Sequence, residues 1–179
     1  CNKNTKKNGQ PYNVYTDGLK VYTTIDSRMQ RYAEEAVNEH VVKFLQPAFN
    51  KENRGKKNAP FSGKLTAKQF NDILGRSVRQ SERYRVMNSQ GATYDEIYKS
   101  FHTPTKMSIF TYHGEVDTTM TPIDSIKYYK SFLRCGFMSM SPINGAVKAY
   151  VGGLNFIHFN YDMCTEGRRQ VGSTIKPFL

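Results

Sequence analysis

An apolar stripe at helical spacing sets the strongest limit on what this chain can fold into. Apolar side chains recur every three or four positions, at Met29, Tyr32, Ala33, Ala36, Val37, Val41, Phe44 and Leu45. This pattern predicts a long amphipathic helix whose apolar face packs on another element along its length. Residues 19–25 (LKVYTTI) precede it and are β-branched and aromatic, which predicts a strand. Asp26 or Ser27 is placed to cap the helix, and Ser27-x-x-Gln30 matches a capping box.

The next part of the chain combines turn-forming residues with short helical patterns. Residues 46–64 are rich in Pro, Gly, Asn and Lys, which predicts a loop. Capping boxes at Thr66-x-x-Gln69 and Thr93-x-x-Glu96 then predict two helix starts, and Thr103-Pro104 predicts the end of the second helix. We therefore interpret residues 46–105 as a helical insertion.

The second half of the chain alternates strands and a helix. Residues 107–112 (MSIFTY) predict a strand that turns at His113-Gly114. Thr121-Pro122 predicts a helix start, with Gly136 as the C-terminal cap. Residues 137–141 and 146–151 predict two hairpin strands, joined by a tight turn at Asn144-Gly145. Segregated helices and hairpins of this kind indicate the α+β class.

Charge and hydropathy narrow the classes of function. The chain carries 26 Lys and Arg against 15 Asp and Glu, a formal charge of +11, which favours anionic neighbours such as nucleic acid, acidic lipid or acidic polymer. No apolar run approaches the roughly 20 residues of a membrane span, so we expect neither a membrane span nor a signal peptide within this sequence. Arginines cluster among aromatic residues in one stretch, which keeps a nucleic-acid-binding module as an alternative: Arg76, Arg79, Arg83 and Arg85.

Cysteine and histidine spacing argues against a metal site. The three cysteines, Cys1, Cys135 and Cys164, form no Cys-x-x-Cys pair, and we expect free thiols, with a Cys135–Cys164 disulfide as the alternative. The four histidines are far apart, so we expect neither a metal nor a cofactor. His158 is flanked by Phe156 and Phe159, which we interpret as packing residues.

A serine and a lysine three positions apart form the candidate catalytic motif. Ser173 and Lys176 stand in the sequence RRQVGSTIKP, after Gly172. On a helix, positions i and i+3 share a face, so a neutral amine could accept the hydroxyl proton. A serine at a helix start also has backbone N–H groups close to developing negative charge. By itself Ser-x-x-Lys is a weak signal, because it is common by chance.

The surrounding residues resemble the transpeptidase domain of penicillin-binding proteins of the bifunctional class A type. The resemblance lies in GAVKAYVGG (145–153), NFIHFNYD (155–162) and GRRQVGSTIKPF (167–178), and in residues 17–37 and 120–140. Ser-x-x-Lys is a motif of this family. The resemblance implies a linker over 1–18, the start of the transpeptidase domain over 19–45, the insertion over 46–105, and the front part of the domain over 106–179.

The resemblance also implies a chemistry and a setting. Ser173 would be the nucleophile that attacks the D-Ala-D-Ala carbonyl of a peptidoglycan stem peptide, and Lys176 would accept its proton. An amine of a neighbouring stem would resolve the acyl-enzyme, and β-lactams would acylate the same serine. The parent protein would lie at the outer face of the cytoplasmic membrane, held by an anchor outside this chain, with a glycosyltransferase domain upstream.

Two further motifs of the family, Ser-x-Asn and Lys-Thr-Gly or Lys-Ser-Gly, do not occur in the sequence. We therefore expect the chain by itself to be inactive although its parent is an enzyme. Val171 stands where the family often has Pro, which affects the stiffness of the loop. The alternative interpretation is a non-catalytic pedestal or docking module that binds anionic envelope components or membrane-proximal cell-wall synthesis proteins. An apolar face left uncovered would favour self-association.

Overall fold

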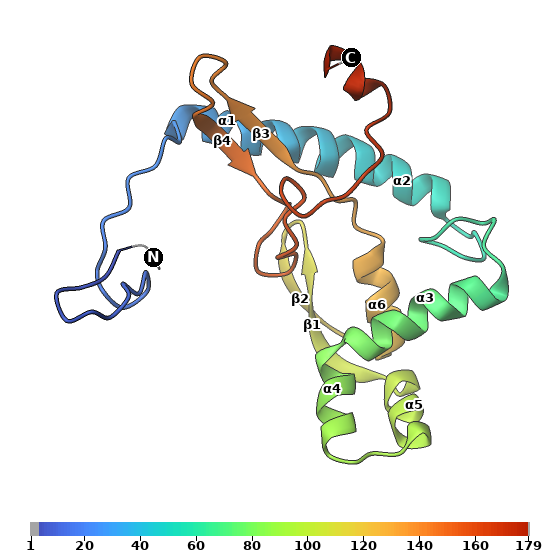
Figure 1. The fold of residues 1–179 in the computed structure, drawn as a ribbon. Coiled ribbons are helices and arrows are strands. Elements are labelled where there is room, and N and C mark those ends of the chain that lie inside the picture. Colours follow the sequence, from blue (N-terminus) through green and yellow to red (C-terminus); the bar gives the residue numbers. More distant parts are fainter. Residues whose placement is uncertain (1–3, 179) are drawn as a thin grey trace.

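The computed structural model describes residues 4–178, in which helices accompany two separate two-stranded antiparallel sheets. Three successive segments, α1 (Ser27–Val37), the π-helical η1 (Asn38–Leu45) and α2 (Gln46–Asn53), form one continuous rod across the upper part of Figure 1. The predicted long amphipathic helix is therefore present. The mixture of helices and small sheets is compatible with the predicted α+β class.

Asp26, not a Ser27–Gln30 capping box, starts α1. The Asp26 carboxylate accepts hydrogen bonds from the backbone N–H groups of Arg28 (2.9 Å) and Met29 (3.2 Å). Gln30 is used elsewhere: its Nε2 donates to the Tyr150 carbonyl (2.9 Å), and the Tyr150 N–H donates to Gln30 Oε1 (2.7 Å). The predicted capping box is wrong because the Gln30 amide pairs with a strand backbone in the same way as a neighbouring strand would.

The predicted strand over residues 19–25 is not formed. These residues have no regular secondary structure, and hydrogen bonds to strand β4 (Val147–Val151) begin at Thr24. There, Thr24 Oγ1 donates to the Val147 carbonyl (2.6 Å), and the Asp26 N–H donates to the Lys148 carbonyl (2.9 Å). A strand needs a ladder of paired backbone groups, so β-branched composition alone was insufficient.

The predicted hairpin over residues 137–151 is confirmed, with a longer turn than expected. Strand β3 (Phe137–Met140) pairs antiparallel with β4, and α1 packs against β4 through Ala33, Ala149, Val151 and Val37. Within the turn only Gly145 has a positive φ (68°), and the Ser141 N–H donates to the Ala146 carbonyl (2.9 Å). The predicted tight two-residue turn is therefore wrong.

Helix α2 occupies part of the predicted loop over 46–64. Gln46 is only 4% exposed, and its side-chain amide forms hydrogen bonds with Tyr112, Ser131 and Leu133, which are far away in the sequence. Pro47 stands at the boundary of η1 and α2, where its missing N–H leaves one backbone hydrogen bond of the continuous helix unmade. Tertiary partners thus extend the helix to Asn53, and only the residues after it form a loop.

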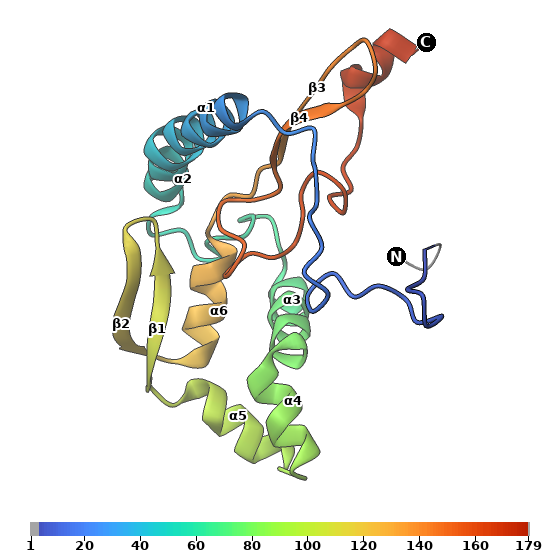
Figure 2. The same ribbon diagram turned by 90° about the vertical axis from the view of Figure 1, so that its left-hand side faces the viewer.

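The helical region is built as its capping boxes predict. Thr66 and Gln69 cap α3 (Ala67–Gln80), and Thr93 and Glu96 cap α5 (Tyr94–His102), with α4 (Glu82–Ser89) between them. Strand β1 (Thr105–Thr111) confirms the predicted strand, and it forms a hairpin with β2 (Gly114–Met120), which was not predicted. The turn is Tyr112-His113, one residue earlier than predicted, because Gly114 already belongs to β2. Figure 2 shows helix α6 (Pro122–Lys130) beside this hairpin. Helix α6 also contacts α3 and α5, so the helical unit continues beyond residue 105.

The predicted cap of α6 at Gly136 is wrong, because the helix ends at Lys130. Its C-cap is Ser131, whose N–H donates to the carbonyls of Lys127 (3.1 Å) and Tyr128 (3.0 Å). Cys135 and Cys164 are free thiols, as expected, whereas Cys1 lies outside the described residues. Within residues 4–178, no helix has both the length and the hydropathy of a bilayer-crossing segment.

Candidate functional site

Ser173 and Lys176 lie on a short 3₁₀ helix, η2 (Gly172–Phe178), near the red C-terminal end in Figure 1. Both side chains are exposed. A 3₁₀ helix has three residues per turn, so these two residues belong to the same face. Gly172 begins the turn at a φ of 55°, in the left-handed region that glycine adopts without strain. The two side chains are not hydrogen-bonded to each other, so their catalytic pairing stays a prediction.

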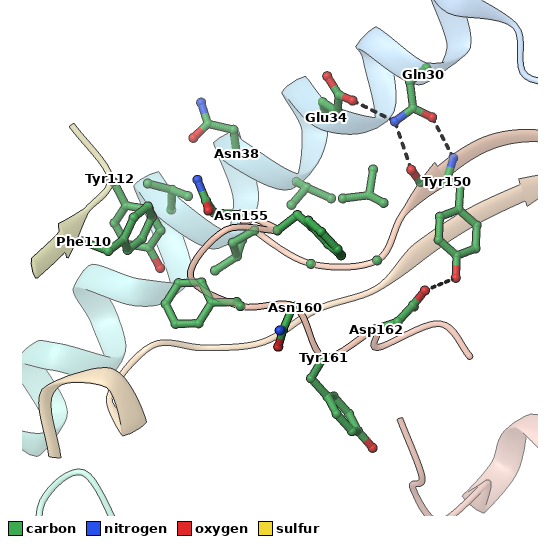
Figure 3. A pocket seen from close by; sticks show the side chains of 18 residues that line it. Gln30, Glu34, Asn38, Phe110, Tyr112, Tyr150, Asn155, Asn160, Tyr161 and Asp162 are labelled. Carbon is green, nitrogen blue, oxygen red and sulfur yellow. Dashed lines mark hydrogen bonds between the residues drawn. The ribbon is translucent and has the colours of Figure 1, made fainter. Parts of the chain in front are cut away.

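The loop that leads to this turn is tied to β4 through Tyr150 and Asp162. The Tyr150 hydroxyl donates to Asp162 Oδ2 (2.5 Å), while Asp162 Oδ1 accepts from the backbone N–H groups of Cys164 (2.8 Å) and Thr165 (3.2 Å). The Tyr150 hydroxyl lowers the pKa of Asp162, and the Asp162 carboxylate raises the pKa of Tyr150. Since Gln30 bonds the backbone of Tyr150, one strand residue links α1 with the loop (Figure 3).

Close packing against Cys164 and Asp162 explains the glycines at positions 136 and 152. A Cβ on Gly136 would lie 2.8 Å from Cys164 Sγ, and a Cβ on Gly152 would lie 3.1 Å from Asp162 Cγ. Burial, and then the neighbouring Cys164, raises the pKa of Cys135, while burial and Asp162 raise that of Cys164. Thiols with raised pKa values are poor nucleophiles, so neither cysteine is a candidate nucleophile.

The same loop is also tied to the β1–β2 hairpin and to the end of α6. Phe159 is 4% exposed, and Arg134 stacks over its ring at 3.8 Å from the centroid. His158 Nε2 lies 3.0 Å from Glu115 Oε1. The prediction that Phe159 packs is confirmed. The same prediction for Phe156 is wrong, because its side chain is 81% exposed.

A cavity of about 580 Å³ lies between α1, η1, β4 and the loop (Figure 3). Ser173 and Lys176 do not line it, and neither does any Lys, Arg or His. Three of its polar side chains already have hydrogen-bond partners within the protein. The Gln30 amide bonds the backbone of Tyr150, and the Tyr150 hydroxyl bonds Asp162. Gln30 Nε2 also donates to Glu34 Oε1 (2.7 Å). The other polar side chains of the lining are amides and phenols: Asn38, Asn155, Asn160, Tyr112 and Tyr161.

The described part of the chain holds no cluster of side chains that could bind a metal ion. Residues 4–178 contain no group of three or more His, Cys, Asp or Glu side chains close enough to share an ion. The residues that hold the loop, above all Gln30, Tyr150 and Asp162, were not identified from the sequence. Their partners lie on other elements, and no local spacing marks them.

Comparison with known proteins gives matches over most of the chain. The family described as "Penicillin-binding protein middle domain" matches residues 56–133. Penicillin-binding protein 1A of Vibrio cholerae is 27% identical over 93% of this chain and 24% of its own length. Penicillin-binding protein 1A of Escherichia coli K12 is 26% identical over 93% of this chain and 23% of its own length. The same-named protein of Pseudomonas aeruginosa is 40% identical over 42 residues, 24% of this chain and 5% of its own length.

The chain thus spans about a quarter of the length of the curated relatives it matches, at 24% and 23% for the first two. No solved structure matches the chain significantly. The family match begins inside the predicted insertion and continues through β1, β2 and α6. Residues 56–133 are thus similar to the middle domain of penicillin-binding proteins, and the matches over 93% of the chain support a relationship with this family.

Proposed function

We propose that this chain is part of a class A penicillin-binding protein that crosslinks peptidoglycan stem peptides through a serine acyl-enzyme. The observation that carries the proposal is the similarity to penicillin-binding proteins 1A over 93% of the chain, which contains Ser-x-x-Lys at Ser173 and Lys176. Support comes from the geometry of η2, because both residues share one exposed face of a turn.

The proposed reaction is an acyl transfer with balanced proton movements. Ser173 Oγ attacks the carbonyl carbon of the D-Ala-D-Ala bond, and a neutral Lys176 amine accepts the hydroxyl proton. Collapse of the tetrahedral intermediate leaves an ester on Ser173 and releases D-Ala, which takes a proton. An amine of a second stem peptide then attacks the ester carbonyl and forms the amide crosslink, while the bond to Ser173 Oγ breaks. The proton lost by the amine passes through Lys176 to Ser173 Oγ, which restores the hydroxyl. The backbone N–H of Ser173 would supply one donor to the oxyanion.

The chain by itself is expected to be inactive. Its 179 residues contain neither Ser-x-Asn nor Lys-Thr-Gly, the motifs that complete the family's site. Lys176 is exposed, whereas a lysine that acts as a base needs surroundings that favour its neutral form. Stoichiometric labelling of the 179-residue chain with a fluorescent penicillin would contradict this expectation.

The nucleophile is tested in the full-length protein. Fluorescent penicillin labelling is read on a denaturing gel for the unmodified protein and for Ser173→Ala, Lys176→Ala and the control Ser89→Ala. Ser89 is exposed on α4, so its variant should label normally. Loss of labelling in the first two variants alone supports the assignment. Persistent labelling of Ser173→Ala refutes it.

The setting and partners of the full-length protein follow from the same proposal. We infer that it acts in the cell envelope at the outer face of the cytoplasmic membrane, with D-Ala-D-Ala stem peptides as substrates and β-lactams as inhibitors. A glycosyltransferase domain and membrane-proximal cell-wall synthesis proteins belong to this proposal. Exposed apolar side chains on α1 and β3, such as Tyr32 and Phe137, favour self-association of the isolated chain.

A second candidate is a non-catalytic module that binds anionic envelope components. The net charge of +11 favours it, as do exposed arginines on α3 and α4: Arg76, Arg79, Arg83 and Arg85. Co-sedimentation with vesicles of acidic and of neutral lipid tests it, since equal binding to both would count against it. The nucleic-acid alternative predicts that a duplex is bound in preference to heparin at equal salt.

A further inference from the structure

Phe159 is held by residues that are distant in sequence and that form an aromatic socket, defined here as Phe110, Tyr129, Phe132 and Arg134. The ring centroid of Phe159 lies 5.2 Å from that of Phe110, 5.4 Å from that of Phe132 and 6.0 Å from that of Tyr129. The Arg134 guanidinium stacks over the same ring at 3.8 Å. An aromatic side chain enclosed in this way has a fixed position and direction.

The socket is itself rigid, because hydrogen bonds lock its two elements together. The Tyr128 hydroxyl donates to the Phe110 carbonyl (2.7 Å), and the Phe110 N–H donates to the Tyr129 hydroxyl (3.0 Å). The backbone carbonyl and the backbone N–H of Phe110 in β1 are therefore both bonded to tyrosines of α6. All three aromatic residues of the socket lie within residues 56–133, the stretch that matches the penicillin-binding protein middle domain.

The residue next to Phe159 makes a second, independent contact with the same unit. His158 Nε2 lies 3.0 Å from Glu115 Oε1 of β2, and the His158 ring lies 5.1 Å from that of Phe110. Two adjacent residues are therefore anchored on β1, β2 and α6. The chain continues from them through Asp162, bound to Tyr150, to the turn that carries Ser173.

We propose that Phe159 is a positioning residue for the Ser173 segment, and that the middle-domain stretch sets the placement of the serine through the aromatic socket. This inference rests on the proposed function of Ser173. Misplacing a reacting group by about 1 Å can lower a rate by about 100-fold. Without the Phe159 contact the loop would still carry Ser173 and Lys176. The Ser173 hydroxyl would no longer be held in one position relative to the substrate.

The structural half of the proposal is tested on the 179-residue chain by amide hydrogen exchange. Phe159→Ala should increase exchange over residues 163–166, whose N–H groups are hydrogen-bonded, while exchange in α3 and α5 stays unchanged. The matched control is Phe156→Ala, in the same loop but with an 81% exposed side chain, and it should exchange as the unmodified chain does. Glu115→Ala removes a largely exposed group and should give a smaller increase in the same residues.

The functional half is tested in the full-length protein by the kinetics of penicillin acylation. Phe159→Ala should lower the acylation rate constant by about 10- to 100-fold with little change in the dissociation constant of the non-covalent complex. Phe159→Leu, which keeps an apolar side chain in the socket, should restore part of the rate. Glu115→Ala should slow acylation less, and Phe156→Ala should not slow it.

Acylation at the unmodified rate in both Phe159→Ala and Glu115→Ala would overturn the proposal, as would equal slowing in Phe156→Ala. A rise in the dissociation constant without a change in the rate constant would overturn it too. Labelling of Ser173→Ala would instead refute the proposed nucleophile, and the exchange measurement is independent of that outcome. The two failures are therefore distinguishable.

Discussion

Replacement of Gln46 by Leu tests whether a buried side-chain amide joins the helical rod to the rest of the molecule. Gln46 Nε2 donates to Asn50 Oδ1 (2.9 Å) and to the Ser131 carbonyl (3.0 Å). Gln46 Oε1 accepts from the Tyr112 hydroxyl (3.0 Å) and from the Leu133 N–H (2.9 Å). One side chain thus connects α2 with the end of the β1–β2 hairpin and with the end of α6.

The magnitude follows from the groups that lose a partner. The exposed Asn50 side chain can bond water instead, so its loss has little cost. The Tyr112 hydroxyl, the Ser131 carbonyl and the Leu133 N–H belong to half-buried residues, and burial raises the pKa of Tyr112 to about 12. Each unsatisfied group costs about 1 kcal/mol or more, so Gln46→Leu should lower the free energy of unfolding by about 3 kcal/mol.

Urea denaturation followed by far-UV circular dichroism measures this loss. With a denaturant dependence of about 2 kcal/mol per M, the midpoint should fall by about 1.5 M. Gln80→Leu is the matched control, because Gln80 is exposed at the end of α3, and it should change stability by less than about 0.5 kcal/mol. A loss below about 1 kcal/mol for Gln46→Leu would refute the reasoning.

Two further substitutions test local features of the loop and the rod. Gly136→Ala should lower stability by about 1–3 kcal/mol, because its Cβ would lie 2.8 Å from Cys164 Sγ; Gly63→Ala, with no atom within 4 Å, should be neutral in the same denaturation assay. Backbone N–H groups of Met29 and Arg28 hold the pKa of Asp26 below its usual value, so its contribution to stability is present above about pH 4 and declines as pH falls through the folded-state pKa. Asp26→Asn should therefore make the pH dependence of the unfolding midpoint shallower below about pH 4, and an unchanged slope would contradict this.

Local signals predicted the helix starts well. The pairs Thr66–Gln69 and Thr93–Glu96 form their capping boxes, and Thr121 caps α6 ahead of Pro122. A cap satisfies backbone N–H groups within three residues, so the information lies in the same few letters of sequence. Strand β1 was predictable because its β-branched and aromatic residues are neighbours in the sequence, whereas its partner β2 was not predicted.

Long-range partners decided the elements that were predicted wrongly. Gln30 has the spacing of a capping box but bonds Tyr150, which is 120 positions away. Gln46 stands beside Pro47 in a stretch with loop composition, yet its bonds to Tyr112 and Leu133 keep it in a helix. The residues next to Gln30 and Gln46 in the sequence do not reveal these distant hydrogen-bond partners. A buried side-chain amide is stable only where such partners are present.

In the candidate site, too, some features follow from local sequence and others depend on tertiary contacts. The sequence by itself determined the pair Ser173 and Lys176, because a spacing of three residues places them on one face of any helical turn. Only the tertiary structure decided what holds the loop that leads to that turn: Phe159 in the aromatic socket, and Asp162 on Tyr150. Burial of an aromatic ring depends on side chains brought together from distant strands and helices, whereas the spacing of two neighbours depends only on the local backbone.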